Sequence, residues 1–243
     1  ASKSRGLGDV YKRQEDVVLL CQALENNNTI HSIFLDYNKL GNDGARAIGA
    51  VLENNNKITK LSITGNDIGP EGVVVIGQAL QSNNTISTLL LTDNNIGPEG
   101  AVSLGQTLKS NYSLINLELF FNNIGSEGAT VIGEALKINK ILQNLDIGSN
   151  DIGPEGGVAI GQALESNNTL ENLNLEGNNI GIKGAVSIGQ ALESNNTLQD
   201  LDLSVNNIGD DGAVAVIRGI ARNTNTHLSI LDLSLIHISE PTR

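Results

Sequence analysis

The chain has 243 residues, of which 39% are hydrophobic, and its formal net charge is −12 at pH 7. A chain this acidic is not expected to bind a nucleic-acid backbone or an anionic membrane surface. It contains one cysteine, Cys21, which excludes an internal disulfide framework, and no run of about 18 apolar residues that could form a transmembrane helix. Because no signal segment stands at its start, we expect a cytoplasmic protein.

The two ends of the chain differ in origin from the rest. The stretches Ser4 to Gln14 and Leu233 to Arg243 can be encoded by the two strands of one DNA string. That string resembles the end of a transposase-type sequencing adapter, and two unrelated protein termini would very rarely be reverse complements of each other. We therefore expect residues 1–14 and 233–243 to be adapter-derived tails and residues 15–232 to be the native part.

The native part repeats itself every 28 residues. The unit is clearest at residues 169–196, TLENLNLEGNNIGIKGAVSIGQALESNN. Residues 15–28 form a partial unit, and a further unit starts near Leu228, two residues later than the period requires. Seven full units begin at Thr29, Lys57, Thr85, Ser113, Ile141, Thr169 and Thr197. Such units cannot bury their apolar faces alone, so the repeat predicts one stacked array.

Each unit predicts a strand, a turn and a helix in that order. The opening LxxLxL alternates apolar and polar residues and suits a strand of about three residues. The NxIG segment turns the chain, and the following GAVSIGQALES carries an apolar stripe at helical spacing, as at Ala185, Ile188 and Leu192. A glycine such as Gly189 recurs inside this helix, where it costs about 1 kcal/mol relative to alanine. Its recurrence predicts a close contact with a neighbouring element.

The unit LxxLxLxxNxIGxxGAxxIGxALxxNN resembles the leucine-rich repeats of the ribonuclease-inhibitor type, which are similar to those of nucleotide-binding immune receptors. The resemblance covers residues 15–232. It implies an α/β solenoid in the form of a horseshoe, with a parallel β-sheet on the concave face and α-helices on the convex face. It also implies a structural ladder of buried asparagines at Asn38, Asn66, Asn94, Asn122, Asn150, Asn178 and Asn206.

No catalytic, metal-binding or cofactor-binding pattern is present. The two histidines of the native part, His31 and His227, lie nearly seven units apart, and none of the phosphate-loop, HExxH or CxxC motifs occurs. Five glycosylation sequons fall at one repeat position, where the turn preference of asparagine already accounts for them. They are Asn27, Asn83, Asn111, Asn167 and Asn195. The sequence therefore predicts no enzyme, no metal and no cofactor.

The positions that the repeat leaves variable are expected to face the concave surface. Every phenylalanine of the chain lies at such a position, and an acidic row Glu118, Asp146, Glu176, Asp202 and Asp232 follows on later units. Exposed aromatics are typical anchors of protein interfaces, and an acidic row attracts a basic partner. The expected protein-binding residues are Phe34, Tyr37, Leu90, Glu118, Phe120, Phe121, Asp146, Glu176 and Asp202.

Two alternatives stand beside this interpretation of the variable positions. Phe120 or Phe121 could fold back over the turn and cover the asparagine ladder, and the acidic row could be the solvated face of an acidic protein. The first function hypothesis is a protein–protein interaction module, the ligand-recognition part of a larger intracellular protein, whose partner carries a basic segment. The alternative is a regulatory piece of an enzyme system such as a Ran-type GTPase activator. The arginines outside the tails, Arg46, Arg218 and Arg222, lie in predicted helices, which counts against that alternative.

Overall fold

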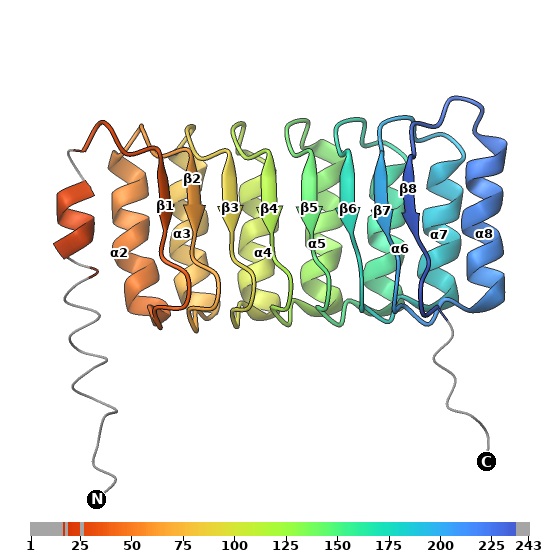
Figure 1. Cartoon of the computed structure of the whole chain (residues 1–243), viewed down its shortest axis with the longest axis horizontal. Coiled ribbons are helices and arrows are strands. Elements are labelled where there is room, and N and C mark those ends of the chain that lie inside the picture. Colours follow the sequence, from red (N-terminus) through yellow and green to blue (C-terminus); the bar gives the residue numbers. More distant parts are fainter. Residues whose placement is uncertain (1–16, 18, 25–26, 237–243) are drawn as a thin grey trace, which may run out of the picture.

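The computed structural model describes residues 17, 19–24 and 27–236. They form a single stack of units in which a short strand is followed by a helix (Figure 1). The strands lie side by side in one layer, and the helices form a second layer that covers one face of the sheet and leaves the other face open. The expected α/β solenoid with a parallel sheet is thereby confirmed.

The elements recur as the sequence period predicts. Residues 17 and 19–24 are helical and precede the first strand. The strands are β1 (Ser32–Phe34), β2 (Lys60–Ser62), β3 (Thr88–Leu90), β4 (Asn116–Glu118), β5 (Asn144–Asp146), β6 (Asn172–Asn174), β7 (Asp200–Asp202) and β8 (Ile230–Asp232). The helices are α2 (Gly41–Asn54), α3 (Pro70–Ser82), α4 (Gly97–Leu108), α5 (Gly125–Ile138), α6 (Gly153–Leu164), α7 (Gly181–Leu192) and α8 (Gly209–Arg222).

The sheet keeps one register along the whole array. Its eight strands follow in chain order, and neighbours are parallel. Leu145 pairs with Leu173, one repeat later. In the last pair Leu201 faces Leu231, two residues beyond the period, as the late start of the final unit predicts. Because the register is constant, equivalent residues of successive units form continuous rows across the sheet.

The core lies between the two layers. The middle residue of each strand from β2 to β7 is buried against the apolar stripe of the helices, as Leu145 and Ile160 illustrate. Successive helices approach so closely that a Cβ on Gly189 would lie 2.5 Å from the backbone oxygen of Ala215 in α8. Glycine is therefore required at this position despite its low helix propensity, and the expected close contact is confirmed.

A first ladder of asparagine side chains runs along the turns that follow the strands. At Asn178, the side-chain nitrogen Nδ2 donates to the backbone oxygens of Ile147 and Leu175, at 2.8 and 3.0 Å. Its Oδ1 accepts the backbone N–H groups of Asn150 and Ile152 from the previous unit, at 2.9 and 3.4 Å. The same position is buried at Asn66, Asn94, Asn122, Asn150 and Asn206. These amides pair backbone groups that the turn would otherwise leave unsatisfied.

Asn38 does not belong to this buried ladder, which corrects the sequence-based expectation. Its side chain is exposed, and its Nδ2 donates to the backbone oxygen of Asp36 in its own turn at 3.0 Å. In the ladder the side-chain nitrogen donates to a backbone oxygen 31 residues earlier, as Asn178 does to Ile147, and for Asn38 that position lies outside the described residues. Asn38 therefore joins the ladder through its backbone N–H, which donates to Asn66 Oδ1 at 2.9 Å.

A second asparagine ladder, which the sequence analysis missed, follows the helices. At Asn167, Nδ2 donates to the backbone oxygen of Leu136 at 2.7 Å, and Oδ1 accepts from the backbone nitrogens of Thr169 and Leu170 at 3.0 and 2.8 Å. Equivalent buried residues are Asn55, Asn83, Asn111, Asn139, Asn195 and Asn223. Four of the five sequon asparagines lie in this ladder. Their side-chain nitrogens are buried and bonded, so they are inaccessible to glycosylation in the folded protein.

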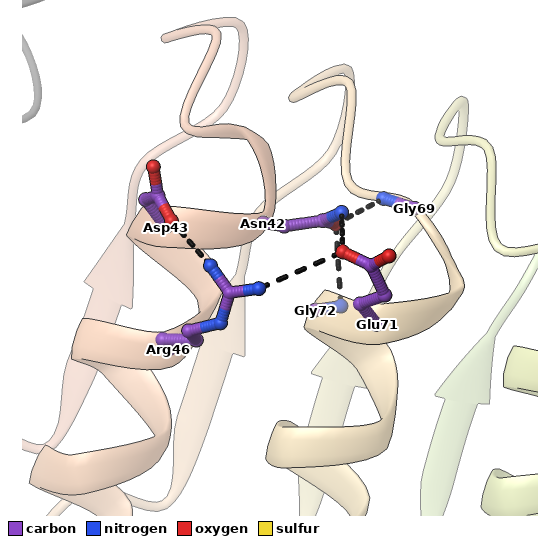
Figure 2. A network of polar contacts seen from close by, with 6 residues as sticks. All are labelled: Asn42, Asp43, Arg46, Gly69, Glu71 and Gly72. Carbon is purple, nitrogen blue, oxygen red and sulfur yellow. Dashed lines mark hydrogen bonds and ion pairs between the residues drawn. The ribbon is translucent and has the colours of Figure 1, made fainter.

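The first ladder is interrupted beside the polar network shown in Figure 2. In other units the glycine at the helix start has a positive φ and donates to the backbone oxygen of the next ladder asparagine, as Gly153 does to Asn178 at 3.1 Å. Gly69 instead has a φ of −95° and donates to Asn42 Oδ1 at 2.8 Å. Asn42 Oδ1 also accepts the N–H of Gly72 at 3.2 Å, so it caps α3 from the neighbouring unit.

The interruption also changes the hydrogen bonding of Asn122. With Gly69 turned away, the backbone oxygen of Ile68 accepts the N–H of Asn95 at 2.9 Å. Asn95 then lacks the positive φ that its counterparts in most other units have. Within the part of the chain that the structure describes, the buried Oδ1 of Asn122 has no hydrogen-bond partner. Asn122 therefore supports the ladder through its side-chain nitrogen alone.

Most of the two expected tails falls outside the described residues. This applies to residues 1–14 and to residues 237–243. Residues 233–236 are described, and the backbone oxygen of Ser234 accepts the N–H of Val205 at 2.9 Å. Residues 233–236 therefore continue the turn geometry of the preceding units.

Asn178→Ala and Asn122→Ala form a matched pair that tests the ladder. Each side chain donates to three backbone oxygens, but only Asn178 also accepts two backbone N–H groups. We expect Asn178→Ala to lower the free energy of unfolding by about 2–3 kcal/mol, and Asn122→Ala by about 1 kcal/mol less. Urea denaturation measures both losses.

The control for this pair is Asn168→Ala, at an exposed asparagine outside both ladders, which should change stability by no more than about 0.5 kcal/mol. Equal losses for Asn178→Ala and Asn122→Ala would contradict the proposed difference in hydrogen bonding.

Candidate functional site

The open face of the sheet carries two rows of side chains. Since the middle residue of each strand points into the core, the first and third residues point to the open face. The first row consists of Ser32, Lys60, Thr88, Asn116, Asn144, Asn172, Asp200 and Ile230. The second row consists of Phe34, Ser62, Leu90, Glu118, Asp146, Asn174, Asp202 and Asp232. An open groove of about 580 Å³ runs along both rows from Lys60 to Asp202.

The first row contains a chain of hydrogen-bonded side chains. Asn116 Nδ2 donates to Thr88 Oγ1 at 3.0 Å. Asn144 donates in the same way to Asn116, and Asn172 donates to Asn144. All these residues line the groove. The row therefore presents a continuous line of side-chain amides, each oriented by its neighbour.

The second row carries most of the expected acidic residues. Glu118, Asp146 and Asp202 line the groove, while Asp232 follows on β8. Asp146 Oδ1 accepts the backbone N–H of Gly148 at 2.9 Å, and Asp202 Oδ1 accepts that of Ser204 at 2.8 Å. These bonds hold both carboxylates in one orientation beside the groove.

Glu176 does not belong to this row, which corrects the sequence-based expectation. The equivalent residue on β6 is Asn174, and Glu176 lies in the turn two residues later. Glu176 occupies the repeat position of Phe120 and Gly148, two residues after the position that carries the other carboxylates. The acidic row is therefore interrupted between Asp146 and Asp202.

Negative charge is disfavoured in the middle of the groove. Burial raises the pKa of Glu118 above its ordinary value, the nearby Asp146 raises it further, and Lys60 lowers it. Burial also raises the pKa of Asp146, while its bonds to Gly148 and Asn174 lower it and the charge of Asp202 raises it. A cation in the groove would offset the mutual repulsion of these carboxylates and favour their charged forms.

The apolar residues expected on the first half of the face lie in different settings. Phe34 is 60% exposed, and Lys60 Nζ lies 5.4 Å from the centre of its ring. Leu90 is half-buried and lines the groove. Phe120 is half-buried because its ring lies on Gly148, where a Cβ would come within 2.7 Å of it. Phe120 therefore covers the turn of the next unit at Gly148.

Phe121 and Tyr37 are exposed at a position that favours glycine. Phe121 has a φ of +56° and is 58% exposed, and Tyr37 has a φ of +58° and is 70% exposed. Two other units have a glycine at this position, Gly65 and Gly177. A large side chain in this left-handed conformation costs about 1 kcal/mol or more, and the fold gains little burial from it. Features of this kind cluster at functional sites.

Six first-row residues that line the groove were not expected from the sequence. They are Lys60, Thr88, Asn116, Asn144, Asn172 and Asp200. The sequence contains the signal, because a strand has a side-chain period of two, so the residues on either side of the first leucine of LxL share one face. Only one position of each strand was expected on this face, and that position accounts for one of its two rows.

Other kinds of site receive no support from the described residues. Among them, no group of three or more His, Cys, Asp or Glu side chains could hold a metal ion. None of the described helices is both long enough and apolar enough to span a bilayer.

Comparison with known proteins agrees with the repeat architecture. A family model described as Leucine Rich repeat matches residues 26–49, 54–77, 82–105, 110–133, 139–161, 166–189 and 194–216. The chain is similar to the tropomodulin C-terminal domain of Caenorhabditis elegans, with 15% identity and a TM-score of 0.52 over 63% of this chain and 92% of that chain. This likeness concerns the fold alone.

The chain is also similar to a solved structure of the actin-binding site 2 of leiomodin-1. The identity is 21% and the TM-score is 0.45, over 72% of this chain and 86% of that chain. No curated protein matches the chain.

The raised pKa of Glu118 predicts that Glu118→Gln stabilises the protein near neutral pH. A carboxyl whose folded-state pKa lies above its unfolded value, here above 4.5, destabilises the fold increasingly as the pH rises through that interval. We expect a gain of at most about 0.5 kcal/mol at pH 7, since solvent screens this group, and no gain below about pH 4. Urea denaturation at the two pH values measures it.

Glu127→Gln in α5 of the same unit is the matched control. Glu127 lies in the first turn of its helix, where a carboxylate is favourable, so its replacement should not stabilise the protein at pH 7. A loss of stability for Glu118→Gln at pH 7 would contradict the account of the groove.

Proposed function

We propose, since the chain belongs to the leucine-rich repeat family, that it is a protein-binding module of the ribonuclease-inhibitor type that contacts its partner through the open sheet face. One observation carries this proposal: the sheet face and its adjoining turns concentrate groups that cost the fold stability. These are the strained, exposed Phe121 and the neighbouring carboxylates Glu118 and Asp146. A partner that covered the Phe121 ring and brought a positive charge to the carboxylates would use both features as binding contacts.

The partner's chemistry follows from the two halves of this surface. Phe121 and Tyr37 offer exposed rings at the turns, and large aromatic anchors typically contribute most of the binding energy. Glu118, Asp146 and Asp202 line the groove beside them and favour a basic segment. Their charges would mainly increase the association rate. The partner is therefore another protein that combines an apolar contact with a basic segment.

We place the module inside the cell, as the ligand-recognition part of a larger protein. The buried sequon asparagines Asn83, Asn111, Asn167 and Asn195 give no site for extracellular glycosylation in the folded state. Cys21 is the single cysteine and is buried, which suits a reducing compartment. A cytoplasmic location is the setting that fits these features best.

The proposed module comprises residues 15–232. We keep the proposal that residues 1–14 and 233–243 derive from a sequencing adapter, because their shared reverse-complement coding is independent of the fold. Ser234 can continue the turn geometry because the pair Leu233 and Ser234 matches the pair Leu203 and Ser204 of the preceding unit. Recovery of the transcript from its source would test these boundaries.

The alternative of a GTPase regulator gains no support from the described arginines. That function would need an arginine or asparagine free to act at a turn edge. All three described arginines lie in helices. Arg46 in α2 pairs with Asp43 and Glu71 (Figure 2). Arg222 in α8 pairs with Glu193 at 2.6 Å, and Arg218 lies in the same helix as Arg222. We therefore propose a binding module without catalytic activity. The likeness to the tropomodulin domain concerns the fold and does not identify the partner.

Phe121→Gly separates a binding role from a structural one. Glycine is the residue of two other units at this position, so the change should raise the free energy of unfolding by about 1 kcal/mol. It should also weaken binding of the natural partner at least about tenfold, because an interface anchor is removed. The partner is captured from a lysate of the source with the full chain, and its affinity is measured by surface plasmon resonance.

Asp202→Asn tests the charge contribution with the same partner. It should slow association several-fold at low salt, and the difference from the unchanged protein should vanish above about 0.5 M salt. Gln162→Ala, on the exposed side of α6, is the control and should leave both rates unchanged. If Gln162→Ala releases the partner while Phe121→Gly and Asp202→Asn do not, the sheet face is not the binding surface.

A further inference from the structure

The first row of the sheet face has the chemistry of a peptide-backbone receptor. We propose that the groove binds its partner as an extended, lysine- or arginine-rich peptide segment whose main chain is hydrogen-bonded by Asn116, Asn144 and Asn172. The inference rests on the proposed function, because it concerns the same face. It adds the conformation of the bound segment and the residues that recognise its backbone.

The side-chain amides keep unused hydrogen-bonding capacity. A side-chain amide has two N–H donors and an oxygen with two acceptor sites. Asn144 uses one N–H on Asn116 and receives one bond from Asn172, which leaves one donor and one acceptor. Asn144 is half-buried in the groove, so the remaining groups are reachable from the open face. A donor and an acceptor side by side match the C=O and N–H groups of an extended chain.

The row also fixes how its amides are presented. Because each asparagine is bonded to its neighbour, their orientations are set before any ligand arrives, which lowers the entropy cost of binding. The backbone groups of a helical ligand are already bonded within the helix, so a helix could not use these amides. The row therefore favours an extended segment over a helical one.

The dimensions suit a short segment that crosses the strands. Neighbouring strands lie about 4.8 Å apart, so Asn116 to Asn172 spans about 10 Å, or about three residues of an extended chain. The lined groove from Lys60 on β2 to Asp200 on β7 spans about 24 Å, which accommodates about seven residues. The bound segment would lie along the array, across the middle strand residues Leu117, Leu145 and Leu173, whose side chains point into the core.

The second row supplies the preference for basic side chains. In an extended segment every second side chain points the same way, about 6.7 Å apart. Lysine or arginine at alternate positions would then reach Glu118, Asp146 and Asp202 across the groove. The fixed orientation of the Asp146 and Asp202 carboxylates matches such a ligand. The first row thus recognises the backbone of the peptide and the second row its charged side chains. Mutations in one row can therefore test one kind of recognition without removing the other.

The test uses the full chain and two synthetic peptides. The first is acetyl-Gly-Lys-Gly-Lys-Gly-Lys-Gly-amide, and the second has the same sequence with every backbone nitrogen methylated, which keeps the charge and removes the backbone donors. We expect the first peptide to bind at least tenfold more tightly than the second in isothermal titration calorimetry at low salt. Equal affinities for the two peptides, or no binding of the first, would overturn the inference.

Asn144→Asp distinguishes backbone recognition from charge attraction. If the groove attracted only positive charge, the added carboxylate would strengthen binding of the unmethylated peptide. If the amide bonds the backbone, its lost N–H donors weaken binding about fivefold to tenfold. Asn144→Ala should weaken binding by a similar factor and leave the dependence of affinity on salt unchanged, whereas Asp202→Asn should flatten that dependence.

Asn168→Ala, an exposed asparagine outside the sheet face, is the control and should bind as the unchanged protein does. Tighter binding by Asn144→Asp would overturn the inference. Such a result would leave the proposed function standing, since the basic peptide would still bind the acidic groove. The proposed function is decided separately, by Phe121→Gly and Asp202→Asn with the natural partner.

Discussion

The fold depends on side-chain amides that replace missing backbone partners between units. A unit of 28 residues reverses its chain twice, and each reversal buries backbone groups that no strand or helix satisfies. Asn178 and its counterparts bond those groups at one reversal, and Asn167 and its counterparts do so at the other. Each amide joins two consecutive units, so the same bonds that satisfy a turn also fix the position of the next unit. This is why the register stays constant from β1 to β7.

Because the asparagine ladders at the turns stabilise the array, the sheet face can contain groups that lower the stability of the fold. Glu118 and Asp146 are placed on adjacent strands because the register demands it, and burial beside the groove raises the pKa of both carboxyls. Phe121 occupies a turn position that glycine would occupy without strain. Neither feature improves the packing of the core. We infer that these destabilising features serve binding, and that they mark the surface that the partner contacts.

The sequence predicts the array well and the details of its surface only in part. The 28-residue period defines the strands, the turns and the close helix contact at Gly189, because these recur in nearly every unit. Features that occur once have no such support. Asn42 stands where three other units have proline, and it redirects Gly69. The effect reaches Asn122, two units beyond Gly69. Only coordinates reveal that chain of hydrogen bonds. Likewise, Phe120 covers the turn because Gly148 in the next unit leaves space for its ring.

Carboxyl footprinting tests most directly whether the sheet face is the binding surface. Carbodiimide coupling of exposed carboxylates, read by mass spectrometry with and without the natural partner, compares groups on the two faces of the protein. We expect the partner to protect Glu118, Asp200 and Asp202 in the groove, while Glu127 in α5 and Glu155 in α6 are labelled to the same extent in both samples. Protection of Glu127 and Glu155, with unchanged labelling in the groove, would contradict the account.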